Sequence, residues 1–172
     1  MSKKFIIFAS DTKLYGMAQL TSSTVQKIRV LLASWTSVRQ KTHVFHWNIT
    51  GSSFNELHKY FEELYDEAVN SMDSCAERLR QVGVFVEMSL KDAAELSVLG
   101  DAGFSTTDDR EMVIDLIRSY AQLTALQNEI YSEADEVGDY VTADLMTQLS
   151  KTNELRSWFL SSWLGEQNQT QL

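Results

Sequence analysis

The three histidines of the chain lie within sixteen residues, at His43, His46 and His58, and carboxylates follow them closely. The carboxylates whose spacing matters most are those of Glu62, Asp73 and Glu77. Imidazole and carboxylate ligands together suit redox-active iron, whereas zinc-finger chemistry needs several thiolates and the chain has one cysteine. These residue types predict a metal site. A solvated helix face is the plainer explanation of regularly spaced carboxylates, and it stays open at this point.

The spacing of these residues places them on one side of a helix but not in one place. His58 and Glu62 are four residues apart, as are Asp73 and Glu77, so all four fall within about a third of the helix circumference. The fifteen residues from His58 to Asp73 span about 22 Å of helix, far more than a metal–ligand bond of about 2 Å. An antiparallel two-fold partner would bring the two pairs together, so the spacing predicts a site shared by two chains.

A di-iron site within one four-helix bundle uses Glu-x-x-His pairs, in which a glutamate precedes each histidine by three residues. The residues at those positions are Gln40, His43 and Asn55, and none is a glutamate. Any iron site in this chain must therefore differ from that of ordinary ferritin.

Composition favours long helices as the elements that position these residues. The 172 residues include no proline and seven glycines, and 44% of them are hydrophobic, which fits one domain with a substantial core. Apolar residues recur at steps of three and four from Val25 to about His46, and again from Phe54 to a stop near Gly83. Capping boxes at Ser23–Gln26 and Ser53–Glu56 are expected to open these two helices, one at each start.

The second half of the chain predicts two more long helices and one short one. A short helix is expected over 89–99, capped by Ser89, and a long one opening at Asp108 and Glu111. Gly138 separates it from the last helix. Four long helices with about 20 residues between the second and third predict an all-α four-helix bundle with a ferritin-like crossover. The expected organisation is an N-terminal arm (1–19), the bundle (20–164) and a flexible C-terminal tail (165–172).

Charge and cysteine content narrow the class of function. The formal net charge of -9 repels nucleic acid and attracts cations. Cys75 is the only cysteine, which precludes an intrachain disulfide and favours the reducing cytoplasm. The apolar run from Phe5 to Ala9 is shorter than a signal peptide requires, and no stretch approaches the ~20 apolar residues of a membrane span.

Two segments resemble the signatures of the Dps family, the DNA-binding proteins from starved cells, also called mini-ferritins. The first runs from His43 through His46-Trp47-Asn48 to His58, and the second is Asp73-Ser-Cys-Ala-Glu77-Arg78-Leu79. The resemblance covers about residues 20–164. It implies a hollow dodecamer with ferroxidase sites at two-fold interfaces, where Fe(II) is oxidised, preferably by hydrogen peroxide, and stored as ferric mineral to protect against oxidative damage.

The resemblance also assigns roles to individual residues. It implies that His46 and His58 are iron ligands, with Glu62 as an acidic residue beside the site, and that the partner subunit donates Asp73 and Glu77. His43, one turn before His46, is expected to lie beside the ligands rather than bind iron. Trp47 is either an oxidisable side chain that quenches stray oxidant or a packing residue at the dimer interface. Cys75 lies on another face and is expected to be a packed thiol.

The acidic residues around the turn between the last two helices suggest a pore. They are Asp135, Glu136, Asp139 and Asp144. In the Dps family this region lines three-fold pores through which iron passes, and Asp144 matches the family pattern best. An ordinary polar helix junction is the alternative.

DNA binding separates two functions of different class. The first is an enzyme and storage shell; the second is a nucleoid-associated protein that condenses DNA and has secondary iron chemistry. DNA binding in the family depends on basic tails, yet the arm before residue 20 has only Lys3, Lys4 and Lys13, and the tail after 164 has no basic residue. Tail charge therefore favours the first function, with weak or absent DNA binding. A bundle that has lost iron chemistry is a third possibility, against which the retained ligand set argues.

Overall fold

A computed structural model describes residues 20–100 and 105–165, which form five helices and no strand. The helices are α1 (Ser22–Asn48), α2 (Phe54–Gln81), α3 (Leu90–Leu96), α4 (Asp109–Glu136) and α5 (Tyr140–Trp163). This confirms the predicted all-α class, with four long helices and one short helix between the second and third. The predicted arm (1–19) and the tail after Gly165 lie outside the described residues.

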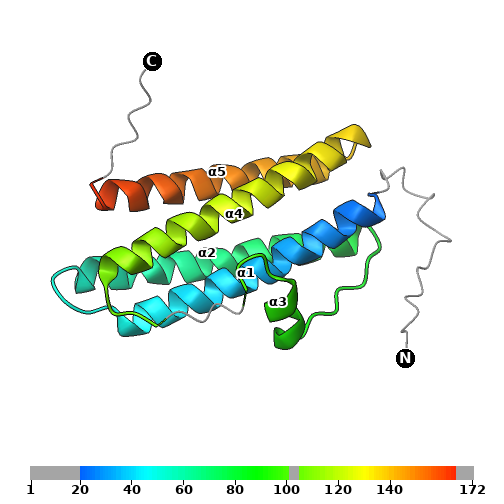
Figure 1. Ribbon diagram of the computed structural model, residues 1–172. Coiled ribbons are helices and arrows are strands. Elements are labelled where there is room, and N and C mark those ends of the chain that lie inside the picture. The colour runs from blue at the N-terminus through cyan, green and yellow to red at the C-terminus, as the bar shows by residue number, and fades with distance from the viewer. Residues whose placement is uncertain (1–19, 101–104, 166–172) are drawn as a thin grey trace, which may run out of the picture.

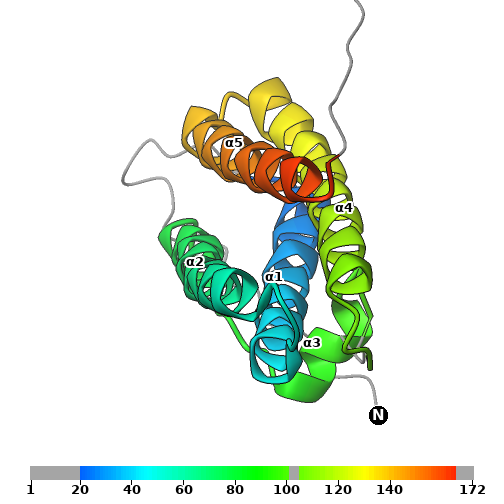
Figure 2. The same ribbon diagram turned by 90° about the vertical axis from the view of Figure 1, so that its left-hand side faces the viewer.

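The long helices form two antiparallel pairs, α1 with α2 and α4 with α5, packed into one bundle (Figures 1 and 2). Helices α2 and α4 run in the same direction, so the chain between them returns along the length of the bundle (Figure 1). Helix α3 sits on this return and packs against α1. The predicted crossover is therefore confirmed, and it leaves α1 and α2 side by side for the whole length that carries the candidate ligands.

The core fills the space between the four long helices. The apolar stripe predicted for α1 is buried, with Ile28, Trp35 and Val38 fully enclosed. Trp35 meets Tyr120 of α4 edge to face, with ring centroids 6.3 Å apart. Burial of each large side chain of this kind contributes about 1.5–3 kcal/mol, so this core fixes how α1 and α2 lie against α4 and α5.

Both capping boxes predicted for the first two helices are wrong. Thr21, not Ser23, caps α1, and its hydroxyl accepts a hydrogen bond from the backbone N–H of Thr24 at 3.1 Å. The Ser23 hydroxyl instead donates to Glu133 on α4 at 3.1 Å. Ser53 makes no side-chain cap, because its hydroxyl donates to Asp109 at 2.8 Å. In both cases a carboxylate from another helix competes successfully with the local backbone for the hydroxyl.

The predicted starts of the next two helices agree with the structure, although α3 ends at Leu96 and not at residue 99. Ser89 and Asp92 form a reciprocal capping box at α3, and Asp108 caps α4. Gly83 and Gly138 adopt φ values of 82° and 73°, the left-handed conformation that ends α2 and α4. No helix in the described ranges is both long and apolar enough to cross a membrane.

Candidate metal centre

His46, in the last turn of α1, and His58, near the start of α2, lie face to face. Their ring centroids are 3.7 Å apart and the planes are inclined by 21°. His46 Nδ1 is 2.7 Å from the backbone carbonyl oxygen of His58, and His58 Nδ1 is 2.9 Å from that of His46. The short α1–α2 loop therefore brings two imidazoles together and holds each by the main chain of the other.

These two hydrogen bonds determine the chemistry of both rings. A carbonyl oxygen can only accept, so each Nδ1 must carry a proton and donate it. In the neutral imidazole the Nε2 atom then has a free lone pair, which is the arrangement found in metal-binding histidines whose other nitrogen is held by a carbonyl. Both rings are fixed in the tautomer that a metal ion needs.

An aromatic stack continues from this histidine pair to the surface. The Tyr65 ring meets the His46 ring edge to face at 5.4 Å and lies 3.9 Å from that of His43. His43 in turn stacks on Trp47, with centroids 5.3 Å apart and planes 5° from parallel. Trp47 is 64% exposed, and Phe54 stacks on the other side of His58 at 4.9 Å. The histidine pair thus sits within a run of rings that ends at an exposed indole.

Two side chains of this stack have shifted protonation equilibria. Burial, together with the charge of Arg39 and the neighbouring His46, lowers the pKa of His43, so this imidazole is neutral at physiological pH. Partial burial and the carboxylates of Glu62 and Asp66 raise the pKa of Tyr65, so its phenol stays protonated. His43 is therefore packed between two aromatic rings as a neutral side chain.

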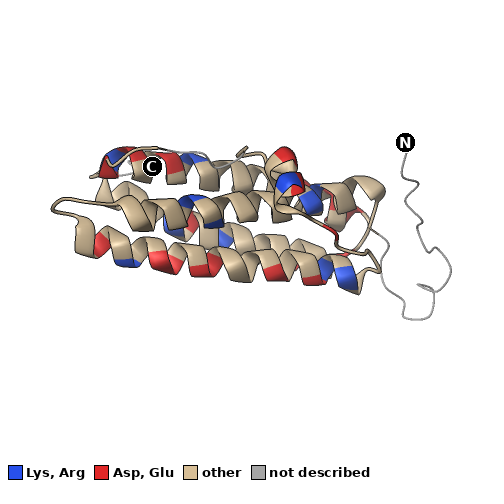
Figure 3. Ribbon diagram, turned by 90° about the horizontal axis from the view of Figure 1, so that it is seen from below, with Lys and Arg blue, Asp and Glu red and all other residues tan. Residues whose placement is uncertain are grey.

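The carboxylates lie along the exposed side of α2. Glu62 is exposed one turn after His58, and Asp73 and Glu77 are exposed further along the helix. Figure 3 shows acidic residues at intervals along α2, with basic residues at its C-terminal end. A mostly apolar groove of about 440 Å³ runs beside Asp73, between α2 and the segment that leads into α3. The carboxylate pair therefore borders a surface that exposes apolar side chains.

No group of three or more histidine, cysteine or acidic side chains within residues 20–100 and 105–165 is arranged to hold a metal ion. The histidine pair and the carboxylate pair remain at opposite ends of α2, as the spacing predicted. The name histidine half-site is used below for His46 and His58 with Glu62, and carboxylate half-site for Asp73 and Glu77.

Asp139 does not belong with the candidate pore residues. It is 2% exposed, and both of its carboxylate oxygens accept hydrogen bonds from Arg78 Nη2 at 2.7 Å. It also caps α5 by accepting from the backbone N–H of Thr142 at 3.2 Å. A buried carboxylate with these partners has no oxygen free for passing ions, which corrects its assignment to a pore. Asp135 and Asp144 are exposed near the same turn, as is Glu136.

The remaining candidates are less informative. Cys75 is buried in the core, where burial raises the pKa of its thiol to about 12, as expected for a packed thiol.

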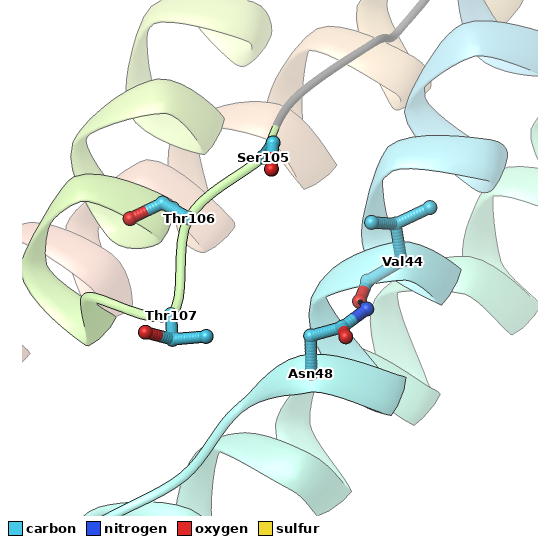
Figure 4. A pocket seen from close by; sticks show the side chains of 5 residues that line it. All are labelled: Val44, Asn48, Ser105, Thr106 and Thr107. Atoms are coloured by element: carbon cyan, nitrogen blue, oxygen red, sulfur yellow. Dashed lines mark hydrogen bonds between the residues drawn. The ribbon is translucent and has the colours of Figure 1, made fainter.

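An open pocket of about 500 Å³ lies between the end of α1 and the segment before α4 (Figure 4). Its lining of Val44, Asn48 and residues 105–107 carries no imidazole or carboxylate, so it is not part of the metal centre.

Three features of the site were not predicted from the sequence. The reciprocal Nδ1–carbonyl bonds depend on the exact path of the α1–α2 loop. Tyr65 lies seven residues after His58, two helical turns along the same side, and that spacing could have drawn attention to it. Arg78 follows Glu77 directly, yet nothing local in the sequence links it to Asp139, 61 residues away.

Comparison with known proteins identifies the family. The model of the ferritin-like domain matches residues 25–169. The DNA protection during starvation protein of Brevibacillus brevis is 31% identical over 153 residues, covering 84% of this chain and 99% of that protein. General stress protein 20U of Bacillus subtilis is 30% identical over 150 residues, covering 85% of this chain and 100% of that protein.

Similar solved structures indicate the same family. A Dps protein of Vibrio cholerae O1, from a broad superfamily of ferritin-like diiron-carboxylate proteins, has a TM-score of 0.79, and Dps from Staphylococcus aureus has 0.80. Each is 28% identical and covers 86% of this chain and 98% of its own. With the fold, the motifs and these relatives in agreement, the chain belongs to the Dps family of ferritin-like proteins.

Proposed function

We propose that the protein oxidises Fe(II), preferably with hydrogen peroxide, at sites between subunits and stores the ferric product as mineral inside a hollow dodecamer. The observation that carries this proposal is the histidine half-site. Two imidazoles lie face to face near the start of α2, each with Nδ1 held by a carbonyl oxygen and with the Nε2 lone pair of its neutral form left for a metal ion. The carboxylates of the same helix lie about 22 Å farther along it. The protein's role would be the protection of the cytoplasm against iron and peroxide.

Each site would combine the histidine half-site of one subunit with the carboxylate half-site of a two-fold partner. Histidine and carboxylate ligands hold iron while leaving positions open for peroxide. Peroxide accepts two electrons, and each Fe(II) supplies one, so two Fe(II) ions reduce one peroxide to water. The chain's own contribution is to hold the imidazoles in one tautomer and to bring the carboxylates to them by assembly.

The surface features fit an assembled shell. Apolar side chains are exposed beside the carboxylate half-site, at Val69 (43%) and Leu90 (81%), where a partner would cover them. The exposed carboxylates of Asp135, Glu136 and Asp144 would line the pores through which iron passes, because grouped negative charge concentrates cations.

The test is peroxide-driven Fe(II) oxidation by the assembled protein, followed by the absorbance of ferric iron. His46→Ala and Asp73→Ala should each slow the reaction by at least about 10-fold to 100-fold, because that range already applies to the loss of residues that only support a metal ligand. Glu154→Ala, which removes an exposed carboxylate of α5, is the matched control and should leave the rate unchanged. Normal rates in both site variants would contradict the site assignment.

DNA condensation is the alternative function, and the negative net charge of the chain disfavours it. Twelve copies at -9 each give a shell charge on the order of -100 before any iron is stored. We expect no shifted complex with duplex DNA at about 150 mM salt in a gel assay. A clear complex under those conditions would favour the nucleoid-associated function.

A further inference from the structure

The start of α1 is tied to the last turns of α4, at the end of the bundle where α4 turns into α5 (Figure 1). The Ser23 hydroxyl donates to Glu133 at 3.1 Å, and Lys27 forms an ion pair with the same carboxylate at 2.9 Å. Glu133 lies about one helical turn before Val137, which caps the C-terminus of α4. The N-terminal arm (1–19) must therefore join the bundle close to the α4–α5 turn.

Three large apolar side chains are exposed at this turn. Val137, Tyr140 and Val141 are 38%, 71% and 60% exposed. They fall within five consecutive residues, so they lie together, and they are called the corner patch below. Exposed apolar side chains that gather in one place mark a surface that another segment or molecule covers.

Negative charge surrounds the corner patch. Asp135, Glu136 and Asp144 are exposed on either side of it, and the last turn of α4 contains no basic residue. The carbonyl groups at the C-terminal end of α4 add partial negative charge at the same place. A segment that fits this surface would therefore combine apolar side chains with basic ones.

The N-terminal arm has this combination in its sequence. The run from Phe5 to Phe8 is Phe-Ile-Ile-Phe, and Lys3 and Lys4 stand directly before it. Three lysines and one aspartate give the arm a net charge of +2, although the whole chain carries -9. The eleven residues between Phe8 and the described bundle can span up to ~36 Å when extended, which is enough to return to the nearby turn.

We propose that the N-terminal arm docks on the corner patch of its own chain. The run from Phe5 to Phe8 covers the apolar side chains, and Lys3 and Lys4 lie beside the exposed carboxylates. In the proposed function these carboxylates attract iron to the pore, so a docked arm lowers the negative charge that incoming Fe(II) meets. This consequence rests on the proposed function, whereas the docking itself does not.

The first measurement is the rate at which trypsin cleaves the Lys4–Phe5 bond in the assembled protein without iron. When docking is fast, this rate follows the fraction of arms that are undocked. Val141→Ser and Phe8→Ser each remove one apolar side chain from the contact and leave every charge in place. Each should speed cleavage about 10-fold, the effect of losing the burial of one such side chain.

The matched control is Leu155→Ser, which changes an apolar side chain of α5 that is 47% exposed and lies farther along the helix. It should leave the cleavage rate unchanged, and size-exclusion chromatography checks the assembly of each variant. Equal cleavage rates in the unaltered protein, Val141→Ser and Phe8→Ser would mean that the arm is only tethered and would overturn the proposal. Loss of assembly in Val141→Ser without faster cleavage would also overturn it, because the corner patch would then be a contact between subunits.

The second measurement locates the docked arm with a carbodiimide, which joins an amine directly to a carboxylate that it touches. Amide links from Lys3 or Lys4 to the carboxylates beside the corner patch are expected in the peptide mass spectrum, and their yield should fall in Val141→Ser. Shells assembled from unlabelled and isotope-labelled chains show which chain each arm reaches. Links that join a labelled to an unlabelled chain would place the arm on a neighbour and overturn docking on its own chain.

The consequence for iron is measured separately, as the initial rate of Fe(II) oxidation at limiting Fe(II). Val141→Ser should raise this rate, because it uncovers the carboxylates. Faster cleavage with no change in the oxidation rate would refute the control of iron entry. Failure of the unaltered protein to oxidise iron would refute the proposed function alone, since the docking is measured without iron.

Discussion

Mixing two inactive variants tests whether each site is divided between subunits. His46→Ala damages the histidine half-site and Asp73→Ala the carboxylate half-site, and these half-sites lie about 22 Å apart on one chain. If every site takes one half from each of two chains, a mixed dimer has one site with both defects and one site with none. Dimers of either variant alone have only damaged sites.

The expected rescue follows from counting. Unfolding and co-assembly of equal amounts of the two variants gives mixed dimers in about half of all pairs, and half of their sites are intact. About one quarter of all sites should therefore regain full activity, against the low background of each variant assembled alone. Site chemistry within single chains would give no rescue at all, because every chain would still carry its own defect.

The assay is the initial rate of ferric absorbance after peroxide addition, with subunit exchange checked by mass-tagged chains. His46→Ala mixed with His58→Ala is the matched control, because both lesions fall in the same half-site and no arrangement makes an intact one. The control mixture should stay at background. Equal recovery in both mixtures, or none in the first despite proven exchange, would refute the division of the site between subunits.

Four further experiments probe the bundle itself. Asp139→Ala removes the carboxylate that neutralises the buried Arg78 guanidinium and should cost about 3–5 kcal/mol in urea unfolding. Burial opposes ionisation of Asp139, but hydrogen bonds from Arg78 and Thr142 outweigh it and lower the pKa of this carboxyl below its ordinary 3.8. The stabilisation from the ionised carboxylate is therefore present above pH 3.8 and is lost as the pH falls through the pKa of the folded state. An acid titration of unfolding would show this loss. Cys75, with a pKa of about 12, should react with thiol reagents at neutral pH only after unfolding. Leu116→Ala should cost about 2–5 kcal/mol because the side chain is fully buried, and a smaller loss in denaturant unfolding would show that the core closes around the gap.

The order of helices was predictable because it depends on signals that are local in the chain. Apolar spacing, the absence of proline and the glycines at 83 and 138 each act within a few residues. The caps at Ser23 and Ser53 could not be predicted in the same way. Their hydroxyls bond to Glu133 and Asp109, which come close only after α4 has packed.

The separation of the two half-sites along α2 was predictable from the sequence, and the detail of each half-site was not. Four-residue spacing and the rise of a helix are enough to separate the carboxylates from His58. The tautomer of the imidazoles was not predictable, since it depends on the backbone carbonyl oxygens of His46 and His58, which the turn after Asn48 brings beside the rings. For Asp139 the acidic neighbourhood in sequence was misleading, because charge along the chain does not reveal a buried partner such as Arg78.

The distance between the half-sites along α2 also means that a chain would gain a complete iron site only after it assembles, and not when it is made. A newly made, unassembled chain offers iron two imidazoles at one end and two carboxylates at the other, and neither is a complete site. In the proposed assembly, oxidation begins only when a second chain docks. The same docking step starts to form the shell that would store the ferric product. If the proposed function holds, the length of α2 would keep a lone subunit from starting peroxide chemistry before the shell is assembled.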